Sequence, residues 1–217
     1  MINIQARTLA EAWKKGFIEL YDKGNKMDDP EILKDDMLIA EISEPLSENE
    51  ADYLHPIFPM KKDVLDAYND YIVLGVNADK VLPEHALYHS RIFSFPAGDN
   101  TFNQINSVIE KLKKDPFSKR AQISMWSPEI DPDERKVPCI QIIWFRVENG
   151  KLVMHVHMRA CDAYKKFLMN LNICAALMSH VSKSIGVMPG KYVHFVDSFH
   201  IYKEDEGQIN KAIHDLK

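Results

Sequence analysis

Cysteine is scarce in this chain of 217 residues, which has only three cysteines and no CxxC pair. An odd number of cysteines without paired spacing argues against a disulfide scaffold and against a zinc site. The cysteine content therefore favours a protein of a reducing cytoplasm that binds no metal ion. A cysteine that is neither in a disulfide nor bound to a metal can act as a nucleophile when it stands beside a basic group.

The sequence also lacks long apolar runs and an excess of positive charge. Nowhere do roughly 18 or more apolar residues follow one another, and the first residues show no basic head before an apolar stretch. The net charge is −5, which disfavours broad binding to DNA or to a membrane surface. We expect a cytoplasmic protein whose partner is a small molecule.

No internal repeat, low-complexity tract or linker interrupts the chain. Its length and its hydrophobic content of 46% are sufficient for one sizeable core. We therefore expect a single domain that covers residues 1–217.

Hydrophobic periodicity predicts helices over residues 9–23, 101–114 and 167–185. The first begins with the capping box Thr8-Leu-Ala-Glu11, and Gly186 ends the last. Strand-like runs occur at residues 37–42, 121–126, 137–147, 151–159 and 192–196.

The hairpin signal Asn149-Gly150 predicts that the strands on either side of it pair antiparallel. Within residues 151–159, the period of two places His155, His157 and Arg159 on one face and apolar residues on the other. These patterns predict an α/β (α+β) protein with a large, mostly antiparallel or mixed sheet and helices on one side.

Cys139 and Arg159 stand out among the polar and reactive residues of these strands. A thiolate needs a nearby cation to lower its pKa from about 8.5, and a phosphorylated substrate needs arginines for bidentate hydrogen bonds. Taken alone, a cysteine in an apolar strand is more often a small core residue. Together the two residues predict a nucleophilic cysteine that faces an anionic ligand.

From Ser118 to Tyr202 the chain resembles the catalytic half of the thymidylate synthases and of their relatives, the pyrimidine-nucleotide hydroxymethylases. The motifs that carry the resemblance are Ser118-Lys119-Arg120, Pro138-Cys139-Ile140, Arg159-Ala160-Cys161-Asp162, Asn170 and His200-Ile201-Tyr202. Arg159 follows Cys139 at the spacing of the family, without a gap. The resemblance implies a fold like that of thymidylate synthase.

The resemblance implies that Cys139 adds to carbon 6 of a pyrimidine, so that carbon 5 can attack the one-carbon unit of 5,10-methylene-tetrahydrofolate. Arg159, Lys119 and Arg120 would hold the 5′-phosphate of a pyrimidine nucleoside monophosphate. In the family the pair at Lys119 and Arg120 comes from the partner subunit. A homodimer built through the sheet is therefore implied.

Other residues take their expected roles from the same resemblance. Asp162 would hydrogen-bond near the reacting ring and its water network, and Asn170 would match the O4 and N3–H edge of uracil. His200 and Tyr202 would reach a ribose hydroxyl. Tyr88 resembles the tyrosine segment that lies beside the nucleophile in the family.

The chain departs from the family at several positions. Ala160 stands where a serine usually touches phosphate, Lys119 replaces an arginine, and Ile140 replaces a histidine. The chain ends in His214-Asp-Leu-Lys217, without the aliphatic end of the tail that closes over folate. The catalytic glutamate of the family has no secure match, and the candidates are Glu48, Glu50, Asp63 and Asp66.

These agreements and departures leave three functions open. Asn170 favours uracil and hence the methylation of dUMP to dTMP. The altered Lys119 and Ala160 and the short tail favour a 5-hydroxymethylase of CMP, dCMP or dUMP, in which water replaces the hydride from folate. A protein that binds nucleotides without catalysis is the third reading, and the retained Cys139 argues against it.

Overall fold

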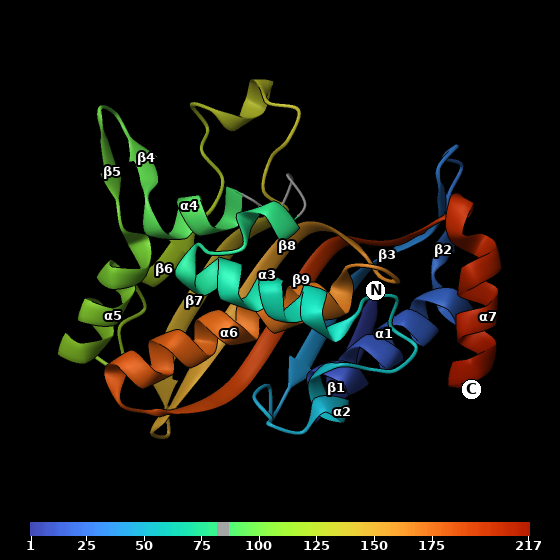
Figure 1. The fold of residues 1–217 in the computed structure, drawn as a ribbon, viewed down its shortest axis with the longest axis horizontal. Helices are drawn as coiled ribbons and strands as arrows, with labels where there is room; N and C mark the ends of the chain where they lie inside the picture. The colour runs from blue at the N-terminus through green and yellow to red at the C-terminus, as the bar shows by residue number, and fades with distance from the viewer. Residues whose placement is uncertain (82–86) are drawn as a thin grey trace.

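The structure, a computed structural model, describes residues 1–81 and 87–217. Its main element is a 7-stranded sheet in the order β1-β3-β9-β8-β7-β6, with β2 paired to β3 (Figure 1). The strands are β1 (Ile2–Ala6), β2 (Asn25–Lys26), β3 (Ile32–Ile42), β6 (Ala121–Ser124), β7 (Ile140–Glu148), β8 (Lys151–Asp162) and β9 (Met188–Tyr202). The pairs β1/β3 and β8/β9 are parallel and the other pairs are antiparallel. The predicted mixed sheet is confirmed.

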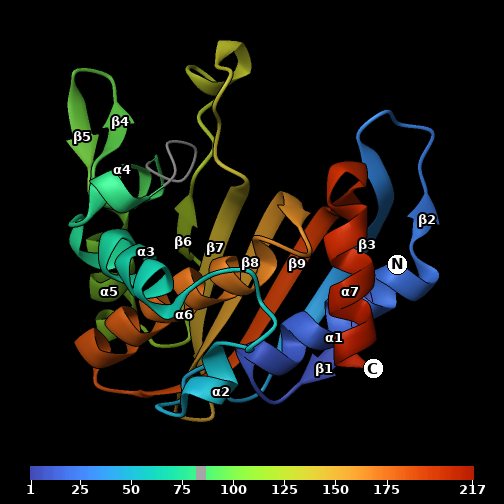
Figure 2. The ribbon, with the colours of Figure 1, turned by 45° about the vertical axis from the view of Figure 1, so that its right-hand side comes forward.

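Helices cover one face of this sheet. They are α1 (Leu9–Lys23), α2 (Glu50–Tyr53), α3 (Lys62–Leu74), α4 (Leu87–Phe93), α5 (Gln104–Lys114), α6 (Phe167–Ile185) and α7 (Glu206–Leu216). In Figure 2, α1, α3, α5 and α6 lie on the same side of the strands. A small hairpin of β4 (Phe95–Ala97) and β5 (Asn100–Phe102) projects from one end, as does the segment at residues 127–138.

The caps predicted from the sequence set the ends of α1 and α6. Thr8 Oγ1 accepts a hydrogen bond from Glu11 N at 3.3 Å, which satisfies one of the free amides of the first turn. Gly186 ends α6 with φ +73°, a left-handed conformation that glycine adopts without strain. Both helices have the boundaries that the sequence predicts.

The alternation predicted for β8 is also confirmed. Its apolar residues Leu152, Met154, Val156 and Met158 are buried under the helices. His155 and Arg159 are exposed on the other face. This pattern shows that the sheet has one covered face and one open face.

The helix predicted over residues 101–114 begins later than expected. Residues 100–102 form β5, and α5 starts at Gln104 because the Asn103 side chain accepts from Asn106 N at 2.9 Å. Phe102, placed by the sequence on the buried stripe, is 52% exposed. The rest of that stripe, from Ile105 to Leu112, is buried as predicted.

The sheet register places three polar residues side by side at one end of the strands. Asp35 of β3 lies opposite His200 of β9, and His200 lies opposite Asp162 of β8. β9 is therefore longer than the predicted strand and carries both His200 and Tyr202. Within the described ranges, none of the helices is long and apolar enough to cross a membrane.

Candidate active site

A pocket of about 290 Å³ opens at this end of the strands. It lies between α4, the start of β7, the end of β8, the start of α6 and the end of β9. Its lining residues are Tyr88, Cys139, Met158, Arg159, Ala160, Cys161, Asp162, Lys166, Asn170, His200 and Tyr202. All the predicted site residues except Lys119 and Arg120 line this one pocket.

Cys139 is half-buried and lies immediately before β7. Its carbonyl oxygen accepts from Arg159 N at 2.9 Å, so the backbones of the two residues are hydrogen-bonded neighbours. The Arg159 side chain also turns back toward this segment, because its Nε donates to Pro138 O at 3.4 Å. The Arg159 side chain is thus anchored to the segment that carries Cys139.

Tyr88 is a buried phenol beside the cysteine. Burial raises its pKa well above the usual value, and the negative charge of a Cys139 thiolate raises it further. Tyr88 therefore keeps its proton and can donate a hydrogen bond. It is not available as a general base.

Asn170 is 2% exposed and has only one end of its amide satisfied. Its Nδ2 donates to the sulfur of Cys161 at 3.3 Å, whereas Oδ1 is buried without a partner in the described part of the chain. Burial raises the pKa of Cys161 well above its usual value, so that sulfur remains a thiol. The Asn170 oxygen is thus an acceptor that lacks a donor.

His200 has the same kind of incomplete environment. The ring is 7% exposed, and its Nε2 is buried without a partner among the described residues. Its Nδ1 lies 3.1 Å from Ser198 O and 3.2 Å from Ser198 Oγ. Leaving a buried polar atom unpaired costs about 1 to 3 kcal/mol. Two such atoms in one pocket are what a site for a polar ligand would show.

Asp162 and Tyr202 complete the polar wall. Asp162 Oδ1 accepts from Tyr164 N at 2.9 Å and from Lys165 N at 3.0 Å. Burial nevertheless raises the pKa of Asp162, because the two amides offset only part of the lost hydration. Burial also raises the pKa of Tyr202, so its phenol keeps its proton.

Lys119 and Arg120 lie outside the cysteine pocket of their own chain. Both are exposed, and Trp144 Nε1 donates to Lys119 O at 3.1 Å. Arg120 lines a separate hollow at the end of α5 together with Lys111 and Lys114. A single chain therefore does not bring this pair to Cys139.

The acidic candidates in the amino-terminal part do not line the cysteine pocket either. Glu48, Glu50 and Asp63 are exposed, and Asp66 lines a different pocket. In the described part of the chain, Asp162 is the carboxylate that lines the wall around Cys139.

Lys166 is a lining residue that the sequence reasoning missed. It lies one helical turn before Asn170, whose backbone N–H donates to Lys166 O at 2.9 Å. Residues four apart share a helix face, so the position of Asn170 was the signal that could have found it.

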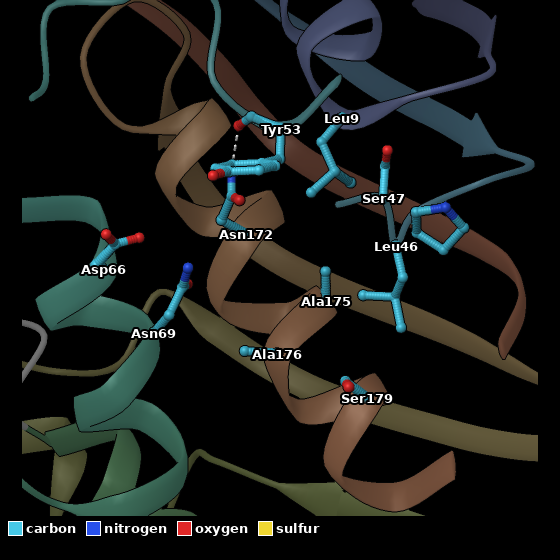
Figure 3. A pocket seen from close by; sticks show the side chains of 11 residues that line it. Leu9, Leu46, Ser47, Tyr53, Asp66, Asn69, Asn172, Ala175, Ala176 and Ser179 are labelled. Carbon is cyan, nitrogen blue, oxygen red and sulfur yellow. Dashed lines mark hydrogen bonds between the residues drawn. The ribbon is translucent and has the colours of Figure 1, made fainter. Parts of the chain in front are cut away.

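A second pocket, of about 250 Å³, lies farther along α6, between that helix, α3 and residues 45–53 (Figure 3). Here Asn172 Nδ2 donates to Tyr53 O at 2.9 Å and to Leu168 O at 2.8 Å. Asn69 lines the same pocket from α3, and its buried Oδ1 has no partner in the part of the chain that is described. No cysteine lines this pocket.

Comparison with known proteins gives a consistent result. A family model described as thymidylate synthase matches residues 67–216. A protein of Methanocaldococcus jannaschii named "Putative thymidylate synthase" is 34% identical over 189 residues, which cover 80% of this chain and 83% of that protein.

Proteins with the same name from Methanococcoides burtonii and Methanosarcina acetivorans are 28% and 25% identical, each over 213 residues. These alignments cover 97% of this chain and 94% of each relative. The likeness therefore extends over the amino-terminal part, where the sequence motifs are sparse. This chain belongs to the thymidylate synthase family.

Proposed function

We propose that this protein transfers a one-carbon unit to carbon 5 of a pyrimidine nucleoside 5′-monophosphate, with the conversion of dUMP to dTMP as the first candidate. Membership of the family supports a transferase. The observation that carries the proposal is the pocket that unites the Cys139 thiol with two unpaired polar atoms, Asn170 Oδ1 and His200 Nε2.

In the proposed reaction the Cys139 thiolate adds to carbon 6 of the base, which makes carbon 5 nucleophilic. Arg159 lies beside Cys139 and would stabilise both the thiolate and the 5′-phosphate. Asn170 Oδ1 needs a donor, and the N3–H of uracil is one. The amino group of cytosine is another donor, so the base has to be determined by assay.

The one-carbon carrier that the family implies is 5,10-methylene-tetrahydrofolate, which supplies the carbon when it is bound. Its flat pterin ring would need an apolar face. Among the described lining residues the aromatic ones are Tyr88 and Tyr202, and these lie beside the cysteine and the histidine. The described pocket thus accounts for the nucleotide better than for the pterin, and we assign no residue to the pterin.

We also propose that the active enzyme is a homodimer built through the open face of the sheet. This face carries apolar side chains, with Ile142 36% exposed and Trp144 and Phe195 half-buried. Lys119 lies beside Trp144 at the border of this face. A second subunit packed there would remove the apolar surface from water and carry Lys119 and Arg120 toward the phosphate of its neighbour.

The shared site can be tested by complementation. Cys139→Ser and Arg120→Ala should each be inactive alone, and mixing them should restore activity, because one of the two sites in a mixed dimer has both residues. Subunit exchange has to be shown by native mass spectrometry. Exchange without recovered activity would refute the shared site.

The alternative function is 5-hydroxymethylation of CMP, dCMP or dUMP. Lys166 and Asp162 make one wall of the pocket polar, and a polar wall admits the water that would quench the exocyclic methylene. This wall is the observation that favours the alternative.

Incubation with dUMP, dCMP, UMP and CMP, each with 5,10-methylene-tetrahydrofolate, tests the proposal. Mass spectrometry of the products separates a methyl from a hydroxymethyl group and identifies the nucleotide. We expect dTMP from dUMP. Binding of nucleotides without any product would refute catalysis and leave the non-catalytic reading.

A further inference from the structure

Asp35 and Ser198 stand next to His200 but are not among the residues that line the cysteine pocket. Asp35 is the cross-strand partner of His200, and Ser198 lies two residues earlier on β9. The hydroxyl of Ser198 donates to Asp35 Oδ2, and its oxygen lies 3.2 Å from His200 Nδ1. The three side chains therefore form a chain of contacts that ends at the pocket.

The directions of these hydrogen bonds can be worked out from their chemistry. A hydroxyl has one proton, and that of Ser198 is engaged by Asp35. Toward His200 the hydroxyl oxygen can only accept. The carbonyl oxygen of Ser198, 3.1 Å from the same ring nitrogen, can only accept as well.

Both groups that face Nδ1 are thus acceptors, and Nδ1 must carry the proton of the neutral ring. Nε2 is then an acceptor. This is the atom that is buried without a partner in the described structure, in a residue that lines the pocket.

We propose that Asp35 is a positioning residue that, through the hydroxyl of Ser198, keeps the proton of His200 on Nδ1 and so reserves Nε2 as the acceptor for a sugar hydroxyl. The identity of the ligand rests on the proposed function, whereas the position of the proton does not. Tyr202 lies beside His200, with ring centroids 4.9 Å apart. A sugar hydroxyl can accept from its phenol and donate to Nε2 at the same time.

Removal of Asp35 would release the hydroxyl proton of Ser198. That proton could then be donated to Nδ1, in competition with the hydrogen bond that Nδ1–H donates to the Ser198 carbonyl oxygen, and the ring proton would shift toward Nε2. A sugar hydroxyl would face two donors, and its own proton would lose its acceptor. Removal of the Ser198 hydroxyl as well would end this competition, because of the two groups only the carbonyl oxygen would then face Nδ1, and it can only accept.

The test combines two measurements on Asp35→Ala, the double variant Asp35→Ala/Ser198→Ala, and Asp36→Ala as the matched control. Asp36 is the adjacent carboxylate and pairs with the amino terminus at 2.8 Å instead. Nitrogen-15 NMR of the imidazole, assigned with His200→Gln, reports which nitrogen carries the proton. Calorimetry compares dUMP with 2′,3′-dideoxyuridine 5′-monophosphate, which lacks the 3′-hydroxyl.

We expect the wild-type protein and Asp36→Ala to show the proton on Nδ1, and Asp35→Ala to shift the tautomer population toward a proton on Nε2. Affinity for dUMP should fall about tenfold in Asp35→Ala and stay unchanged for the dideoxy nucleotide. The double variant should recover both the tautomer and most of the affinity. A merely structural role of Asp35 would not be rescued by a second deletion.

An Nδ1 proton that persists in Asp35→Ala would overturn the inference. Equal weakening of both nucleotides would overturn the role in reading the sugar. If the wild-type protein binds neither nucleotide, the proposed function fails, and the NMR result alone decides whether Asp35 controls the proton.

Discussion

The two pockets beside α6 are similar in volume, yet they use their asparagines differently. In the pocket around Cys139, the Asn170 oxygen and the His200 Nε2 are buried without partners. In the pocket beside α3, both protons of the Asn172 amide are bound to backbone carbonyls, and the Asn69 oxygen is buried without a partner among the described residues. Two unpaired atoms beside a half-buried thiol suggest a binding site, whereas an amide that donates to two backbone carbonyls suggests a structural contact.

Among the variants that test this difference between the two pockets, the largest effect is expected at Cys139. Cys139→Ser should reduce turnover by about a hundredfold or more, because a hydroxyl without an activating base is a far poorer nucleophile than a thiolate. Nucleotide binding, measured by calorimetry, should remain nearly intact. Cys174→Ala is the control, since burial raises the pKa of Cys174 to about 12 and keeps it a thiol. Residual activity above a few per cent in Cys139→Ser would sink the covalent mechanism.

The next largest effect concerns Asn170. Asn170→Asp should move preference from uracil toward cytosine nucleotides by about tenfold to a hundredfold, because mispairing a buried polar edge costs about 1 to 3 kcal/mol. The measurement is kcat/KM for dUMP and dCMP with both proteins. A wild-type preference for dCMP or CMP would show that Asn170 does not discriminate between the bases.

Asn172 should behave in the opposite way. Asn172→Ala removes the donor to Tyr53 O and Leu168 O and should lower the free energy of unfolding by about 1 to 3 kcal/mol, with turnover unchanged. Urea unfolding and a standard activity assay measure the two quantities. Asn69→Ala, which removes no side-chain hydrogen bond to another described residue, should stay within about 0.5 kcal/mol of the wild type. A loss of turnover in Asn172→Ala would mean that the pocket beside α3 takes part in function.

The smallest effect is expected from Asp162. Its pKa is raised by burial, so the folded state binds its proton more tightly than the unfolded state, and its contribution to stability is lost as pH rises through the folded pKa. Asp162→Asn should therefore raise the melting temperature at pH 7 by no more than about 4 °C. The gain should vanish below pH of about 4, where the wild-type side chain is protonated in both states. A gain that persists at low pH would show that charge burial is not its cause.

The sequence predicts best what repeats along one element. The helix at residues 167–185 and the faces of β8 follow from periodicity alone. The prediction that Phe102 belongs to the buried stripe was wrong. Its spacing continues the apolar stripe of α5, but the helix begins after the Asn103 cap and so excludes Phe102. The order of the sheet does not follow from such patterns, because β3 and β9 are far apart in sequence.

In the candidate site, too, the residues that could be predicted are those that belong to a local sequence pattern. Cys139, Arg159 and Asn170 could be predicted because each stands in a motif with fixed spacing, and the structure brings them into one pocket. Lys166 belongs to no motif. Asp35 contacts Ser198 across 163 positions of sequence, and nothing in a linear pattern relates two residues at that distance.

The pairing of β3 with β9 also affects how the protein must be made. Residue 35 leaves the ribosome long before residue 200, and most of the other strands of the sheet are synthesised before the strand beside which it belongs. Until then the inner edge of β3 is an unpaired strand that can join other chains. Contacts so distant in sequence make folding slow. The wall of the cysteine pocket can therefore form only after β9 has been synthesised, and a nascent chain that stalls earlier exposes an edge prone to aggregation.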